Sequence, residues 1–141
     1  MPLSTEQIEN IVMLLKSEDL TVVQQGNHLT EIPASIGSLS ALTRLDLGKP
    51  NLDSLSDTVE SLTNLNKLDL VCNQLSDVPK SIGELTNLRR LGLITNQFTS
   101  LPDSVGELSG LSYLSLETNA LTCLPDSIRT LSNLTQLELD S

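Results

Sequence analysis

The residue types that most often carry out catalysis are few in this sequence. His28 is the only histidine, so no cluster of histidines can hold a metal ion, and we interpret it as a solvated surface residue. Asp46 and Asp69 could place two carboxylates side by side, as a glycosidase requires. An open, uniform surface, however, has no cleft that would raise the pKa of either carboxyl. We therefore expect no enzymatic activity, no cofactor and no metal.

The two cysteines, Cys72 and Cys123, lack the spacing of metal ligands. In the repeat described below, two stacked strands separate them by about 10 Å, which is too far for a disulfide bond. Reduced cysteines indicate a reducing compartment. The N-terminus also lacks the basic start and the apolar stretch of a signal peptide. We therefore expect a cytoplasmic protein.

A repeat of 23 residues must position these side chains. Its clearest copy starts at Leu65 and reads LNKLDLVCNQLSDVPKSIGELTN, and similar copies start at Leu42, Leu88 and Leu111. A fixed period of this length indicates stacked units that share one core. Leucines two residues apart predict one short strand in each unit, and one strand per unit predicts a parallel sheet. The segment LPxSIGxL lacks the alternation of a strand and predicts a short helical return.

An asparagine recurs at the ninth position of the repeat. The four copies are Asn27, Asn73, Asn96 and Asn119. Because a side-chain amide can both donate to and accept from the backbone, we predict that these residues form a structural ladder. Pro50 stands at the same position in the unit from Leu42 and has no backbone N–H to donate. We predict a local distortion there, beside Asn51.

The pattern LxxLxLxxNxLxxLPxSIGxLxN resembles the leucine-rich repeat, in the 23-residue form of intracellular scribble, Ras-suppressor and plant Ras-group proteins and of some bacterial proteins. The resemblance covers residues 27–141 as one continuous domain: a half repeat at 27–41, full repeats from 42, 65, 88 and 111, and a truncated repeat at 134–141. It implies an α/β solenoid with parallel strands on the concave face and short helical or irregular convex segments. It also implies a protein–protein interaction surface on the concave face.

Residues 1–26 are expected to form an N-terminal helical cap. A helix over residues 4–16 would begin with a capping box and would place its apolar residues on one face. Such a helix would cover the open end of a solenoid, although the same face could instead bind a partner. Residues 17–26 are compatible with a second short helix, which we prefer, or with a degenerate strand.

Three columns of residues point outward from the predicted strands. The columns read Arg44, Lys67, Arg90, Tyr113, Gln136, then Asp46, Asp69, Gly92, Ser115, Glu138, and then Gly48, Val71, Ile94, Glu117, Asp140. Exposed ion pairs would explain the charges but not the apolar side chains among them. Tyrosine and arginine are also frequent at binding hot spots. We predict a partner-binding patch formed by Arg44, Lys67, Asp69, Val71, Arg90, Ile94, Tyr113 and Glu117.

The charge balance restricts the partners. With 18 acidic and 8 basic residues, the formal net charge is −10, which disfavours nucleic acid and anionic lipid as partners. No apolar run approaches the length of a membrane span. We therefore expect a non-enzymatic module that binds a protein or peptide. Two alternatives stay open: an assembly protein that self-associates through an exposed C-terminal strand at 134–140, and a bacterial effector that mimics host repeat proteins.

Overall fold

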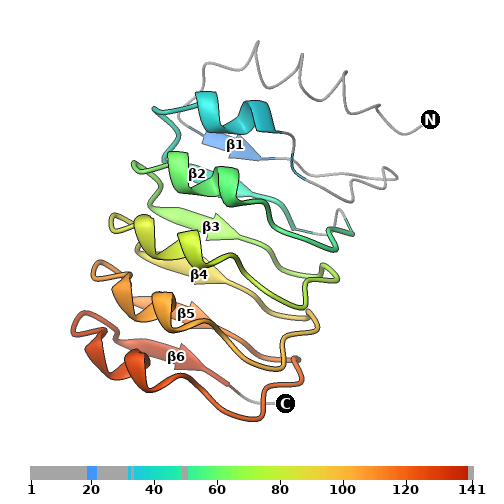
Figure 1. Cartoon of the computed structure of the whole chain (residues 1–141), viewed down its shortest axis with the longest axis vertical. Coiled ribbons are helices and arrows are strands. Elements are labelled where there is room, and N and C mark those ends of the chain that lie inside the picture. Colours follow the sequence, from blue (N-terminus) through green and yellow to red (C-terminus); the bar gives the residue numbers. More distant parts are fainter. Residues whose placement is uncertain (1–18, 22–31, 33, 49–50, 140–141) are drawn as a thin grey trace.

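The computed structural model describes residues 19–21, 32, 34–48 and 51–139. Within these residues, six short strands form one parallel sheet whose spatial order follows the sequence (Figure 1). The strands are β1 Asp19–Thr21, β2 Arg44–Asp46, β3 Lys67–Asp69, β4 Arg90–Gly92, β5 Tyr113–Ser115 and β6 Gln136–Glu138. One 3-10 helix follows each of the first five: η1 Ala34–Ser38, η2 Asp57–Ser61, η3 Lys80–Glu84, η4 Asp103–Glu107 and η5 Asp126–Thr130. Each strand and its helix make one coil of a solenoid, as predicted.

The core lies between the sheet and the helices, which all pack on one side of the sheet (Figure 1). The central residue of each strand from β2 to β5 is a leucine that is at most 1% exposed, namely Leu45, Leu68, Leu91 and Leu114. Helices η1 to η4 each bury a further apolar residue, of which Ile82 and Val105 are fully buried, whereas η5 buries none. Because no coil can bury its leucines alone, the stack is stabilised by apolar contacts between coils. The opposite side of the sheet, here called the strand face, points away from the helices.

The spacing between coils is regular from β2 onward and different before it. Each of β3 to β6 pairs with the preceding strand at an offset of 23 residues, whereas Asp19 of β1 pairs with Arg44 of β2. The preference for a helix over residues 17–26 is therefore wrong at 19–21, which form a strand. Counting back 23 residues from Arg44 would start this strand at Thr21. It starts at Asp19 instead, because the first coil is two residues longer than the later ones. The helix predicted at 4–16, together with Asn27, His28 and Pro50, lies outside the described residues.

Asparagine amides join the coils that start at Leu65, Leu88 and Leu111 each to the one before it. The Asn73 Nδ2 donates to the Leu70 carbonyl in its own coil and to the Leu47 carbonyl in the preceding one, both at 2.9 Å. Its Oδ1 accepts from the Leu52 N–H at 2.8 Å. Asn96 and Asn119 repeat the same three bonds one and two coils later. The predicted ladder is therefore confirmed for these three residues.

The residue that follows Pro50 has a backbone conformation that its equivalents in the later turns do not share. In those turns the residue just before the ladder asparagine has a positive φ, as Cys72, Thr95 and Thr118 show. Asn51, one position after Pro50, has a positive φ of 68°, whereas Gln74, Gln97 and Ala120 at the same repeat position do not. Asparagine tolerates this conformation better than most residues. The described backbone of this coil therefore differs from the later coils at Asn51, and Pro50 itself lies outside the described residues.

A second row of asparagines follows the coils on the exposed surface. Nδ2 of Asn64, Asn87 and Asn133 donates to the carbonyl of Ser40, Thr63 and Ser109, respectively, at 2.7–2.8 Å. All three asparagines are exposed, so water can replace these bonds at little cost. Both rows thus use a hydrogen bond from an asparagine amide to a backbone carbonyl, but Asn73 is buried and Asn64 is exposed. Comparing the two residues therefore measures how burial changes the contribution of this bond to stability.

We predict that Asn73→Ala lowers the free energy of unfolding by about 3 kcal/mol, because it leaves buried backbone groups without partners. Asn64→Ala should lower it by less than about 1 kcal/mol, because its single bond is exposed. Chemical denaturation of the two variants and the wild type measures both values. Equal losses would contradict the role assigned to the buried ladder.

We also predict that the close packing of the helices makes Gly106 irreplaceable. A Cβ at Gly106 would lie 2.5 Å from the Ser127 carbonyl oxygen, whereas a Cβ at Gly37 would lie no closer than 3.4 Å to any atom. Gly106→Ala should therefore cost about 2 kcal/mol of stability, and Gly37→Ala should be neutral or stabilising by less than about 1 kcal/mol. Thermal unfolding followed by circular dichroism provides the test, and equal stabilities of the two variants would refute it.

Candidate binding surface

The structure brings the eight predicted partner-binding residues onto the strand face. Arg44, Lys67, Arg90 and Tyr113 are register partners on successive strands. Hydrogen bonds continue past the strand ends, from the Cys72 N–H to the Ile94 carbonyl and from the Thr95 N–H to the Glu117 carbonyl, at 2.9 Å each. The eight side chains are exposed or half-buried, in contrast to the buried leucines that alternate with them. They therefore form one surface, as the repeat spacing predicts.

Two of these residues bind each other. The Lys67 Nζ lies 3.4 Å from Asp69 Oδ2, and Asp69 Oδ1 accepts from the Val71 N–H at 3.2 Å. The same bond recurs one coil earlier, where Asp46 Oδ1 accepts from the Gly48 N–H at 3.1 Å. The carboxylates of this column thus hold the backbone at the ends of the strands. Lys67 thus has a partner within the strand face, whereas the exposed Arg44 lies beyond that pair.

A connected array of three side chains crosses the last three strands. The Arg90 guanidinium stacks on the Tyr113 ring at 4.3 Å from its centroid, and the Tyr113 hydroxyl donates to Glu138 Oε2 at 2.5 Å. The contacts join β4, β5 and β6 and keep the ring in one orientation. Beside the phenol, Ser115 is only 1% exposed although it belongs to an outward column. We call Arg90, Tyr113 and Glu138 the tyrosine array.

The sequence analysis placed Glu138 in an outward column but did not include it among the binding residues. Glu138 is the register partner of Ser115, so it lies diagonally from Tyr113 on the next strand. In a sheet, an aromatic side chain can reach its diagonal neighbours. This rule could have identified Glu138 as a contact of Tyr113 from the sequence. The spacing alone does not say whether the ring turns toward β4 or toward β6.

The array raises the pKa of Tyr113 above its ordinary value of 10.0. The main cause is the hydrogen bond to Glu138, because the carboxylate accepts only from the neutral phenol, and burial adds to it. The neighbouring Ser115 hydroxyl and the positive charge of Arg90 act in the opposite direction. Tyr113 is the only tyrosine and there is no tryptophan, so its optical signal reports on this site alone.

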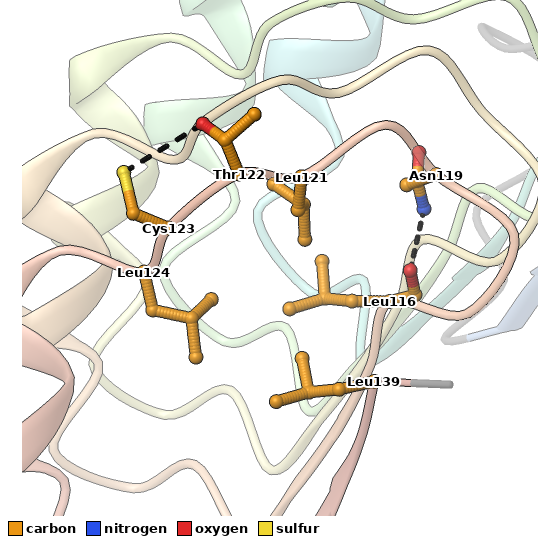
Figure 2. Close-up of a pocket in the computed structure, with 7 residues that line it drawn as sticks. All are labelled: Leu116, Asn119, Leu121, Thr122, Cys123, Leu124 and Leu139. Carbon is orange, nitrogen blue, oxygen red and sulfur yellow. Dashed lines mark hydrogen bonds between the residues drawn. The ribbon is translucent and has the colours of Figure 1, made fainter. Parts of the chain in front are cut away.

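At the C-terminal end of the stack, apolar side chains line a groove of about 270 Å³ (Figure 2). The lining residues are Leu116, Asn119, Leu121, Thr122, Cys123, Leu124 and Leu139. Cys123 is exposed and Cys72 is half-buried, and both thiols are free. In the described part of the chain, no group of three or more histidine, cysteine, aspartate and glutamate side chains is arranged to hold a metal ion. The same part of the chain contains no helix long and apolar enough to cross a membrane.

Comparison with known families identifies the architecture. The family model described as "Leucine rich repeat" matches residues 40–98 and 86–141. The chain belongs to the leucine-rich repeat family. Its sheet is accordingly the concave lining of a leucine-rich repeat solenoid, and such solenoids commonly serve as protein–protein interaction modules. A search of the curated proteins found no match to the chain.

Solved structures of other leucine-rich repeat proteins have the same fold. A protein of Leptospira interrogans is 27% identical with a TM-score of 0.67, and the match covers 98% of this chain and 40% of that one. The plant peptide hormone receptor RGFR1, in complex with RGF2, is 25% identical with a TM-score of 0.78, over 99% and 22% of the two chains. The ectodomain of the receptor kinase GASSHO1/SCHENGEN3 from Arabidopsis thaliana, in complex with CASPARIAN STRIP INTEGRITY FACTOR 2, is 27% identical with a TM-score of 0.73, over 99% and 17%. This chain thus spans less than half the length of each.

We predict that the Tyr113 phenol titrates above pH 10 and that Glu138→Gln moves its pKa back toward 10. Absorbance at 295 nm measures this titration directly, because the phenolate of a single tyrosine is observed. Glu107→Gln, an exposed change on the helical side, serves as the control and should leave the titration unchanged. An identical pKa in the wild type and Glu138→Gln would show that the hydrogen bond does not form in solution.

The same shift predicts how stability depends on pH. The folded state favours the neutral phenol, so its pKa is higher folded than unfolded. The contribution to stability is fully present below the unfolded value of about 10 and is lost as the pH rises through the folded value. Wild-type and Tyr113→Phe proteins should therefore converge in stability above that range. A difference that stays constant with pH would contradict the assignment.

Proposed function

We propose that this chain is a non-enzymatic interaction module that binds a protein or a peptide segment on its strand face. The observation that carries the proposal is the composition of that face. Exposed Arg44 and Arg90 share one register column with half-buried Tyr113, and half-buried Val71 and Ile94 follow β3 and β4 on the same face. The three apolar or aromatic side chains contribute little to the core, because leucines already fill it. Their position is explained by contact with a partner.

The tyrosine array supports the same proposal energetically. Binding normally costs free energy to immobilise side chains, about 0.5–1.5 kcal/mol for each flexible one. Tyr113 is already held by a cation–π contact on one side and a hydrogen bond on the other, so less of this cost remains. An ordered aromatic ring beside an arginine is the composition of a binding hot spot.

The chemistry of the strand face favours a partner segment with both apolar and acidic residues. Apolar side chains of the partner would pack against Val71 and Ile94, and a carboxylate would approach Arg44, which lies outside the Lys67–Asp69 pair. The structural neighbours RGFR1 and GASSHO1/SCHENGEN3 were determined with bound partners, which supports a protein or peptide as the ligand class. Charge would mainly orient the partner, and apolar contact would supply affinity.

We also propose a cytoplasmic location for this chain, as the 23-residue intracellular form of the repeat suggests. Two free thiols, one of them exposed, support a reducing compartment. Subcellular fractionation of the native cell with an antibody against the chain tests the location. Recovery in the secreted or surface fraction would overturn it without affecting the binding proposal.

A capture experiment tests the binding proposal. The first bait is the wild type, and the second carries Arg90→Glu, Ile94→Asp and Tyr113→Ala on the strand face. A third, matched bait carries Lys80→Glu, Ser132→Asp and Thr86→Ala, three exposed positions outside the strand face. We expect a specific protein to be captured by the first and third baits and lost from the second, by at least about tenfold in affinity when the interaction is reconstituted.

Circular dichroism and thermal unfolding of all three baits provide the control for misfolding. We expect all three baits to fold, because the substituted side chains are exposed or half-buried. Capture of the same protein by all three baits with equal affinity would reject the strand face as the binding surface.

A further inference from the structure

Gly92 is the glycine in the second outward column of the strand face. The register places it in line with Asp46, Asp69, Ser115 and Glu138, all of which have side chains. Glycine weakens a strand, because it loses more backbone freedom on folding than other residues and has no side chain to pack. A glycine in a strand often marks a bulge, a tight bend or a place where another molecule approaches closely.

The backbone of β4 does not require a glycine. Gly92 lies in unbroken register between Asp69 of β3 and Ser115 of β5, so the strand has no bulge at this point. The Leu70 N–H donates to the Gly92 carbonyl at 2.8 Å, and the equivalent bond from the Leu93 N–H to the Ser115 carbonyl measures 3.0 Å. The φ of Gly92 also lies outside the left-handed region that favours glycine. A residue with a side chain could therefore adopt the same backbone conformation.

Packing does not require a glycine at this position either. A Cβ at Gly92 would lie 3.2 Å from Asp69 Oδ1 and 3.5 Å from Val71 Cγ2, and both atoms are ends of side chains. The Asp69 carboxylate would have to move by only a few tenths of an ångström. A Cβ at Gly106, in contrast, would meet the backbone oxygen of Ser127 at 2.5 Å. Close approach by another molecule is the explanation that remains for Gly92.

Gly92 lies at the centre of the predicted partner-binding patch. Arg90 and Tyr113 are on its first-column side, where the guanidinium stacks on the ring. Val71 and Ile94 are on its third-column side, and both are half-buried. Because Gly92 has no side chain, a group of the partner can reach the sheet backbone between these residues. An aliphatic side chain placed there would contact apolar groups on both sides, as the anchors of protein interfaces do.

The charge of Arg90 adds a second requirement for the partner. The ion pairs among the described residues are Lys67–Asp69 and Arg129–Asp126. Arg90 is exposed and therefore makes no ion pair within the described part of the chain. A guanidinium that stacks on a ring keeps its N–H groups available for a carboxylate, which can accept two of them at once. Charge complementarity thus favours a partner carboxylate at Arg90.

We propose that Gly92 is the point at which the partner of the strand face inserts an aliphatic side chain, while a carboxylate of the same segment binds Arg90. The inference rests on the proposed function, because it specifies the chemistry that the same surface recognises. Residues 90 and 92 are about 7 Å apart along β4. An extended partner segment therefore carries the aliphatic and the acidic residue about two positions apart.

Thermal unfolding, followed by circular dichroism, tests whether the fold needs the glycine. Gly92→Ser introduces the side chain that Ser115 has at the equivalent position of β5. We expect its unfolding midpoint to stay within about 3 °C of the wild type or to rise, because most residues stabilise a strand better than glycine. Gly106→Ala, whose Cβ would meet a backbone atom, should lower the midpoint by about 6 °C. Equal decreases would mean that the fold requires Gly92, which would overturn the inference.

Peptide binding tests the contact itself. A random-peptide library displayed on phage is selected on the immobilised wild-type chain, and the enriched peptides are synthesised. We expect them to contain an aliphatic and an acidic residue about two positions apart. Fluorescence anisotropy should then give an affinity for Gly92→Ser at least about tenfold below that for the wild type. Gly37→Ser, the same substitution on the helical side with room for a Cβ, should bind like the wild type.

Double-mutant cycles assign each group of the peptide to its contact on the chain. Alanine in place of the aliphatic residue and Gly92→Ser should together weaken binding at least about threefold less than the product of their separate effects, because both remove one contact. The same result is expected when the acidic residue is replaced by its amide and combined with Arg90→Gln. Arg129→Gln, an exposed change on the helical side, is the control and should leave the affinity unchanged. Effects that simply multiply would show that the contacts do not form.

The strand-face variant with Arg90→Glu, Ile94→Asp and Tyr113→Ala separates this inference from the proposed function. Loss of affinity for that variant, together with full affinity for Gly92→Ser, would leave the strand face as the binding surface and overturn the contact at Gly92. Equal affinity for the wild type and the strand-face variant, or a library from which no peptide is enriched, would reject the strand face as a peptide-binding surface. The inference would then fail with it.

Discussion

The asparagine amide that ties three successive coils each to the preceding one is the interaction on which the rest of the structure depends. Asn73, Asn96 and Asn119 each satisfy backbone groups in two successive coils. Because these backbone groups are buried or partly buried, an apolar replacement such as alanine would leave them unpaired. The amides therefore fix the chain length of each coil, and a constant length keeps equivalent residues in register. The columns of the strand face are a direct result of that regularity.

Most of the fold could be predicted from the sequence because several copies of the repeat show the same pattern. Four full repeats and two partial ones agree on the strands, the helical returns and the outward columns, so a local ambiguity in one copy is resolved by the others. The first coil had no such support. Its strand at Asp19–Thr21 follows a longer spacing to Arg44, and extrapolation from the regular repeats placed it two residues away. Counting by a fixed repeat length gives the wrong strand position where a coil differs in length.

The strand face was predicted as a set of positions but not as a set of contacts. Spacing places Arg90 beside Tyr113 and predicts which residues share a face, yet it does not determine side-chain rotamers. The hydrogen bond from Tyr113 to Glu138 depends on a diagonal contact, and Lys67 forms an ion pair with Asp69. Neither contact follows from the spacing of the repeat.

The central claim is that the strand face, and no other side of the solenoid, contacts the partner. Hydroxyl-radical footprinting of the purified complex, analysed by mass spectrometry, tests it most directly because it reports the exposure of individual side chains. We predict that oxidation of Ile94 and Tyr113 decreases when the partner binds, whereas oxidation of Pro102 on the helical side stays the same. Protection of Pro102 with unchanged oxidation of Tyr113 would contradict the account.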